Sequence, residues 1–318
     1  MFKVLKNKWK NYRHRFLPWL ALNLRHRMVP ESLQINNHGK DCIPKTKIEN
    51  SLKEMLLALE NPCKGTDTAL TIFGRDSSKR RKMFEKCGKK NREILLQQFG
   101  FNLEIKKSAM PGAGNGVFLN GTLTRGQVAA LYPGSIYMPY QPILLPSINN
   151  PYVFRCADGC FIDGNYKGIS ALIFRSIHGR DRIGSRIPIC DISWLHLRSI
   201  MEDNKTSSES YLNPNNVNIN MLTNPLNVGQ IVNNANPEIP GCSANLAYYE
   251  ITLTFGEAET DMFKDYLILG LIPNNYYKKE TLNGLEPIVV KVVALVAITD
   301  VQHGEELLTT YFTLVDNS

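Results

Sequence analysis

The segment His303-Gly304-Glu305-Glu306-Leu307-Leu308-Thr309-Thr310-Tyr311-Phe312 gives the first indication of the fold. It follows the apolar run 287–298, which is rich in Val and Ile. These residues stiffen an extended backbone and pack well on a pleated surface, so the run predicts a buried strand. Residues 299–304 then predict a turn, and residues 305–312 the next extended segment. A strand, a glycine turn, two acids and a tyrosine are together still a weak signal.

Two earlier stretches add to that segment. One is Gly112-Ala113-Gly114-Asn115-Gly116-Val117-Phe118, and the other is Gly229-Gln230-Ile231-Val232-Asn233-Asn234. Each stretch alone is unspecific, because Gly-rich and Asn-rich segments also form ordinary turns. The three motifs in this order, between residues 112 and 312, are specific.

The ordered set resembles the SET domain of protein lysine methyltransferases. The resemblance implies a mostly β, α+β fold built from small sheets. It also implies a C-terminal pseudoknot, in which the last segment is threaded under the loop that holds Asn233 and Asn234. Along the chain, we expect a basic helical N-terminal region at 1–98 and a SET domain at 99–318. A large insert is expected at about 138–225.

The same resemblance implies S-adenosylmethionine as the cofactor and assigns residues to its site. Tyr311 matches the active-site tyrosine of the family, and Tyr132 is a second candidate tyrosine of the substrate channel. Asn234 stands where the family has a histidine, but contacts made by the backbone would survive this change. The residues expected to bind the cofactor are Gly114, Asn115, Gly116, Val117, Asn233, Asn234 and Tyr311.

Two neighbouring acids, Glu305 and Glu306, could suggest a general acid–base pair. Adjacent residues of a strand point to opposite faces, however, so we interpret them as turn and salt-bridge residues. No metal site is expected. Cys156 and Cys160 have no further cysteine or histidine partners nearby and are interpreted as packing residues.

The expected function is therefore methyl transfer from S-adenosylmethionine to a lysine of a protein substrate. The alternative is a catalytically inactive SET module that acts as a peptide-binding scaffold. An acceptor other than lysine also stays open. The presence of Tyr311 and of the Gly114-Asn115-Gly116 motif favours the enzyme over the scaffold.

Charge is divided unevenly along the 318 residues, whose 37 Lys and Arg against 29 Asp and Glu give a net charge of +8. Residues 1–107 contain 24 basic and 10 acidic residues, a net charge of +14. Residues 108–318 contain 13 and 19, a net charge of −6. The motifs therefore lie in the acidic part, which suits a protein substrate with a basic segment.

Residues 1–30 carry eight Lys and Arg and no acid. Their apolar residues recur at three- and four-residue intervals and predict a helical face. Three interpretations stay open: a helix packed on the domain, a segment that binds nucleic acid or an anionic surface, and a mitochondrial presequence. The apolar face comprises Trp9, Tyr12, Phe16, Trp19 and Leu20.

The seven cysteines are odd in number and form no C-x-x-C pair. Together with the lack of a secretory signal, they predict a reducing intracellular compartment, either nucleus or cytoplasm, with the mitochondrion as an alternative. Lys291 interrupts the longest apolar run, so no membrane-spanning segment is expected.

Overall fold

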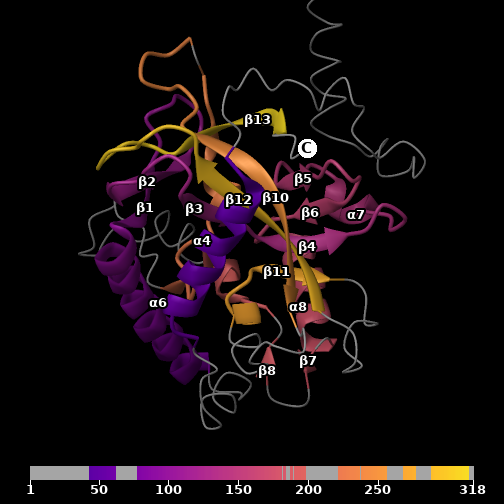
Figure 1. The fold of residues 1–318 in the computed structure, drawn as a ribbon. Helices are drawn as coiled ribbons and strands as arrows, with labels where there is room; N and C mark the ends of the chain where they lie inside the picture. Colours follow the sequence, from indigo (N-terminus) through magenta and orange to yellow (C-terminus); the bar gives the residue numbers. More distant parts are fainter. Residues whose placement is uncertain are drawn as a thin grey trace, which may run out of the picture.

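The structure, a computed structural model, describes residues 43–61, 77–180, 182–183, 187–188, 190–197, 221–236, 238–255, 268–276 and 288–314. The side chains of residues 77–81, 178–180, 182–183, 187–188, 255, 276, 288–289 and 311–314 fall outside this description. Several small sheets and a few helices make up the fold (Figure 1). The mostly β, α+β class expected from the sequence is confirmed.

Two helices precede the first strand. Helix α4 (Lys45–Ala58) places its apolar residues three and four positions apart, and so buries one face. Helix α6 (Ser77–Phe99) ends before Gly100, whose φ of +82° is a left-handed conformation that glycine adopts readily. The buried face of α4 and Leu95 of α6 belong to the same hydrophobic cluster as the sheets. The boundary between 1–98 and 99–318 therefore stays a prediction, and residues 1–42 lie outside the described part.

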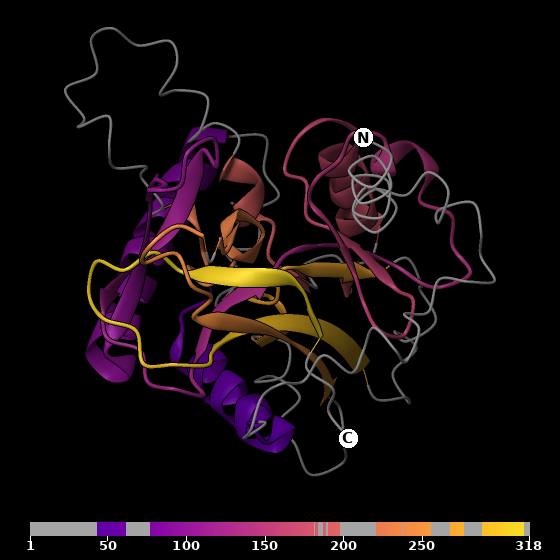
Figure 2. The same cartoon turned by 90° about the horizontal axis from the view of Figure 1, so that it is seen from above.

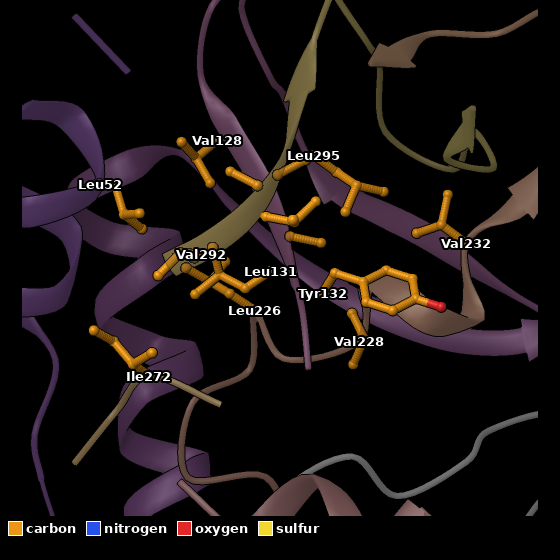
Figure 3. Packing of buried hydrophobic residues seen from close by; sticks show 14 of the residues in the cluster. Leu52, Val128, Leu131, Tyr132, Leu226, Val228, Val232, Ile272, Val292 and Leu295 are labelled. Carbon is orange, nitrogen blue, oxygen red and sulfur yellow. The ribbon is translucent and has the colours of Figure 1, made fainter. Parts of the chain in front are cut away.

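The largest sheet has five strands in the order β3-β12-β10-β13-β9. Strand β12 (Ile288–Ala297) pairs antiparallel with β3 (Val128–Tyr132) on one side and with β10 (Leu246–Phe255) on the other. Its side chains from Val290 to Ala297 are buried except Lys291, as expected of a strand covered on both faces. Figure 3 shows side chains of β3 and β12 packed together in this cluster.

The segment after β12 returns into the same sheet. Strand β13 (Leu308–Leu314) lies between β9 (Asn233–Asn234) and β10 and runs parallel to both. Since residues 235–245 join β9 to β10, this connection must cross β13. The C-terminal strand is thus threaded past the loop that follows Asn234, which confirms the expected pseudoknot.

A second sheet lies beside the first, and the expected insert supplies two of its four strands. Its strand order is β11-β4-β6-β5, with β11 (Asn274–Tyr276), β4 (Gly134–Tyr137), β6 (Phe161–Asp163) and β5 (Val153–Arg155). Helix α8 (Gly168–Arg180) contacts β4 and β11 of this sheet, and helix α7 (Leu144–Ser147) contacts α8. In both views, α4 and α6 lie on one side of the molecule and the β4–β6 sheet on the other (Figures 1 and 2).

A hairpin of β1 (Phe101–Lys107) and β2 (Asn115–Gly121) completes the framework of the site. Among the described residues, no helix is both long and apolar enough to cross a membrane. The remaining short elements are β7 (Arg182–Ile183), β8 (Ile187–Pro188), η2 (Ser193–His196) and η5 (Gly229–Ile231).

Candidate functional site

The Gly-rich motif forms the turn between β1 and β2. The backbone N–H of Ser108 donates to the carbonyl of Gly114 at 2.8 Å, which closes the turn. Gly112 and Gly114 have φ of +79° and +76°, and a side chain would be strained in this conformation. A Cβ at either position would meet no atom within 4 Å, so the turn presents an open backbone surface.

Gly116 has a different reason to be glycine. A Cβ at this position would lie 2.1 Å from Oε1 of Glu306 and 3.1 Å from Nδ2 of Asn233. The missing side chain therefore makes room for a carboxylate and an amide that come from the other two motifs. All three sequence motifs meet at Gly116.

Asn233, the first residue of β9, uses both hydrogens of its side-chain amide. Nδ2 donates to the carbonyl of Asn115 at 3.1 Å and to Oε1 of Glu306 at 3.0 Å. Both partners can only accept, so the network fixes which atom of the amide is nitrogen. The half-buried Asn233 keeps Oδ1 as an acceptor with no partner among the described residues.

Glu306 lies at this centre, although the sequence predicted only a turn and salt-bridge residue there. Besides Asn233, its carboxylate accepts the Ser108 hydroxyl at 2.8 Å through Oε1 and the Ala109 backbone N–H at 3.1 Å through Oε2. It makes no ion pair with a described residue, so the expected salt bridge is wrong for Glu306. The neighbouring Glu305 is exposed and accepts the backbone N–H of Gln302, as expected of a turn residue. No signal for this was present in the sequence alone, since the closeness of Glu306 to Gly116 appears only in the fold.

Asn245 holds the C-terminal segment in place. Its Nδ2 donates to the carbonyl of Glu306 at 2.9 Å, and its Oδ1 accepts the N–H of Leu308 at 2.8 Å. The side-chain amide of Asn245 thus bonds the backbone on both sides of Leu307. From the sequence, the length of the 235–245 loop left the role of Asn245 open.

The other expected cofactor residues lie around this centre. Val117 is fully buried, and its carbonyl accepts the N–H of Leu307 at 2.8 Å. Asn234 pairs with Thr309 in the sheet, and its Nδ2 donates to the carbonyl of Ala235 at 3.3 Å. The structure therefore brings Asn115, Gly116, Val117, Asn233 and Asn234 together, with Gly114 on the adjoining turn.

The two candidate tyrosines differ in what can be said of them. Tyr132 is buried on β3, and its hydroxyl donates to the carbonyl of Tyr152 at 3.0 Å. Its ring lies 5.3 Å from that of Phe154 and 6.3 Å from that of Tyr248, centroid to centroid. Tyr311 belongs to β13, but its side chain falls outside the described residues.

The backbone of β13 nevertheless places Tyr311 on the strand next to β10, which carries Tyr248. Strand β10 pairs Leu246 with Thr309 and then Tyr248 with Leu314, and the register shifts between these two pairs. Tyr311 lies within this irregular stretch, beside the strand that carries Tyr248. Of the three aromatic residues, Tyr248 thus lies on the strand that pairs with the segment containing Tyr311.

One group of potential metal ligands occurs among the described residues: Cys156, Asp158 and Glu250. The ammonium of Lys291 already bonds both carboxylates, with Nζ 3.0 Å from Oε2 of Glu250. Burial raises the pKa of the Cys156 thiol well above its ordinary value, and raises the pKa of the nearby Cys160 to about 12. The group is arranged as an ion-paired cluster with two buried, protonated thiols.

Comparisons with known proteins agree with this geometry. No protein-family model matches the chain. The human protein SET domain-containing protein 9 is 32% identical over 333 residues, covering 99% of this chain and 98% of the human one. The protein of the same name from Pongo abelii is 37% identical over 227 residues, covering 71% and 69%. CpSET8 from Cryptosporidium, a solved structure, aligns over 92% of this chain and 95% of its own with 10% identity and a TM-score of 0.28, a likeness that adds nothing to the assignment.

The threaded C-terminal strand, with the Gly-rich turn and the Asn motif beside it, defines a SET-domain protein. With a relative 32% identical over nearly the whole of both chains, this chain belongs to the family of SET domain-containing protein 9. The resemblance found in the sequence is thereby confirmed.

Proposed function

We propose that this protein is an S-adenosylmethionine-dependent methyltransferase that methylates a lysine of a protein substrate. One observation carries the proposal: the amide of Asn233 is bonded to Asn115 of the Gly-rich motif and to Glu306 of the C-terminal motif. Three distant segments are thus assembled around one side chain, whose remaining polar atom is an acceptor. Membership in a SET-domain family supports the same function.

The residues at this centre fit the expected cofactor. S-adenosylmethionine supplies a methyl group activated by a sulfonium, and it also carries an ammonium that needs acceptors. Oδ1 of Asn233 is such an acceptor, held in place by the two bonds of its own Nδ2. The turn at Gly112 and Gly114 has open space where side chains would be, so a ligand can approach its backbone. In this role Asn233 would bind the ammonium of the cofactor, and the turn would provide an open backbone surface against which the cofactor packs.

On the acceptor side, the protein has to hold a lysine amine in line with the methyl group. The half-buried ring of Phe154, backed by the buried Tyr132 and Tyr248, would contact the aliphatic stem of a lysine. The hydroxyl of Tyr311 would orient the amine. Holding the reacting atoms in this geometry supplies most of the acceleration, because methyl transfer asks the protein to stabilise little new charge.

The charge division supports a basic protein substrate. Residues 108–318, which contain the candidate site, carry a net charge of −6. Such a field attracts a cationic peptide. Residues 1–30 are then available for a different contact, with nucleic acid, an anionic surface or the domain itself, in the nucleus, the cytoplasm or the mitochondrion.

A binding and transfer experiment tests this function. The full-length protein is titrated with S-adenosylmethionine in a calorimeter, and is then incubated with labelled donor and an array of lysine-containing peptides. We expect saturable binding and label on lysine. Binding without transfer to any peptide would favour the inactive scaffold, and absence of binding would remove both versions of the proposal.

A further inference from the structure

The carboxylate of Glu306 carries a negative charge into the candidate donor site. Its described partners are the Ser108 hydroxyl, the Ala109 backbone N–H and the Asn233 amide, all of them neutral. Their dipoles satisfy its hydrogen-bonding capacity but leave its charge uncompensated. An anion in this position stabilises any cation that binds beside it.

Among the other carboxylates in the described part of the chain, some have cationic partners, whereas the buried Asp163 and Asp191 accept only from neutral donors. Lys291 bonds Asp158 and Glu250. On β1, just before the Gly-rich turn, Lys106 is paired with Glu104 instead of Glu306. Glu306 differs from Asp163 and Asp191 in its place, because it lies directly against Gly116 and Asn233 at the candidate donor site.

We propose that Glu306 makes the donor site selective for a cationic donor over its neutral product, and that it positions Asn233. This inference rests on the proposed function. In the transfer, a bond forms between the lysine nitrogen and the methyl carbon. The carbon–sulfur bond breaks and its electron pair stays on sulfur. The positive charge thus leaves the sulfur and appears on the amine, which later releases a proton to solvent.

The charge of the bound cofactor changes by one unit in this step. S-adenosylmethionine carries a sulfonium, an ammonium and a carboxylate, a net charge of about +1 at neutral pH, whereas S-adenosylhomocysteine is neutral overall. Glu306 attracts the first more strongly than the second. The same residue thus favours donor binding before transfer and product release after it.

The test compares the two ligands on two glutamine variants of the full-length protein. Glu306→Gln keeps the shape of the side chain and removes the charge. With the amide oxygen at the position of Oε1, the bond from Asn233 is kept and the Ser108 hydroxyl can rotate to accept from the new amide nitrogen, while the Ala109 N–H loses its acceptor. The exposed Glu305→Gln is the matched control, because it removes the same charge one residue away. Calorimetry gives the affinity of each variant for S-adenosylmethionine and S-adenosylhomocysteine.

For Glu306→Gln, we expect the S-adenosylmethionine affinity to fall about tenfold, as for a lost charged hydrogen-bond partner. The preference for S-adenosylmethionine over S-adenosylhomocysteine should fall about threefold or more, because only the first is a net cation. Glu305→Gln should leave both affinities within about twofold of the parent, as an exposed charge is well screened.

The other possible outcomes contradict either the inference about Glu306 or the proposed function. Equal losses for the two ligands would make Glu306 a structural residue, and unchanged affinities would remove it from the site; both leave the proposed function intact. A parent protein that binds neither ligand would overturn the proposed function itself. If Glu306→Gln does not fold, the salt dependence of the parent protein's two affinities provides the test. Between low and high ionic strength, S-adenosylmethionine must lose more affinity than S-adenosylhomocysteine. Equal salt dependence would overturn the inference.

Discussion

At the scale of single residues, the arrangement of the donor site depends on the orientation of one amide. Asn233 donates both hydrogens of Nδ2, to Asn115 and Glu306, and so presents Oδ1. A rotated amide would present donors in the same place and would repel an ammonium. The chain therefore specifies not only an asparagine but also which end of it meets the ligand.

Replacing this residue should weaken donor binding. Removing a hydrogen-bonding partner costs about 1–3 kcal/mol, so we expect Asn233→Ala to bind S-adenosylmethionine roughly five- to a hundredfold more weakly. Asn234→Ala is the comparison, since contacts expected at that position come from the backbone and should survive. Calorimetry on the folded variants measures both, and equal affinities for parent and Asn233→Ala would remove Asn233 from the site.

Tyr311 is expected to act on the rate and hardly at all on donor affinity. Tyr311→Phe keeps the ring and removes the hydroxyl. The loss of one positioned donor at a transition state typically lowers the rate by about 10²–10³, and we expect a loss of that order. Single-turnover kinetics with saturating donor provide the measurement. Full activity in a folded Tyr311→Phe protein would rule out the catalytic assignment.

At the scale of elements, the sequence predicted those strands whose residues decide their own conformation. The Val-rich run 287–298 became β12, and the extended segment expected at 305–312 became β13 from Leu308 onward. Helix α6 ends before Gly100. These outcomes follow from local preferences, because β-branched residues favour strands and glycine favours a left-handed helix end.

Contacts between elements that are distant in the sequence could not be predicted from such local preferences. The roles of Glu306 and Asn245 depend on β13 lying between β9 and β10, which no local pattern encodes. The threading itself was expected only from the resemblance to a family. Without it, Glu306 is one acid of a turn, and its contact with Ser108, 198 residues away, is invisible.

The second sheet, β11-β4-β6-β5, contains a buried acid, Asp163, whose titration should change the stability of the fold with pH. Burial raises the pKa of Asp163 on β6 from 3.8 to about 6, although hydrogen bonds from Ser170, Asn150 and Asn165 oppose this. The folded protein thus binds more protons than the unfolded chain between pH ~4 and pH ~6. Its contribution to stability falls as the pH rises through this window. The full effect is about 3 kcal/mol, at 1.36 kcal/mol per pKa unit.

Asp163→Asn should remove this dependence. The asparagine keeps Oδ1, which accepts from Asn150 at 2.7 Å, and places its nitrogen at Oδ2, which has no hydrogen-bond partner in the described part of the chain. We expect the free energy of unfolding of the variant to gain on the parent by up to about 3 kcal/mol between pH 4 and pH 7. Urea denaturation across this range measures the difference. A difference that does not vary with pH would show that Asp163 does not titrate in this window.

At the scale of the whole molecule, charge separates two functions that the chain would combine. The first 107 residues carry +14 and the remainder −6. The described contacts of the donor centre come from residues 108–116, 233–245 and 305–309, all in the acidic part. A change in the basic part should therefore alter what the protein adheres to without altering donor affinity.

Removing residues 1–30 tests this separation. We expect the truncated protein to bind S-adenosylmethionine as the parent does, and to lose any binding to polyanions or anionic vesicles that weakens steeply with salt, because released counterions drive such binding. Calorimetry and a salt series measure the two properties. If polyanion binding persists unchanged after truncation, the basic segment has another role, such as packing on the domain.

The most direct test of lysine methylation is the pH dependence of transfer to a single-lysine peptide, with an arginine-substituted peptide as control. At pH ~7 roughly one lysine amine in 2,500 is neutral, for a pKa of about 10.4. No general base is evident in the motifs, so deprotonation should go to solvent before transfer. With subsaturating peptide and chemistry limiting, the rate should then rise near tenfold per pH unit into the alkaline range. For lysine methylation we expect this slope, label on lysine alone and a rate that depends on Tyr311. A protein that binds the donor and transfers nothing at any pH would contradict it.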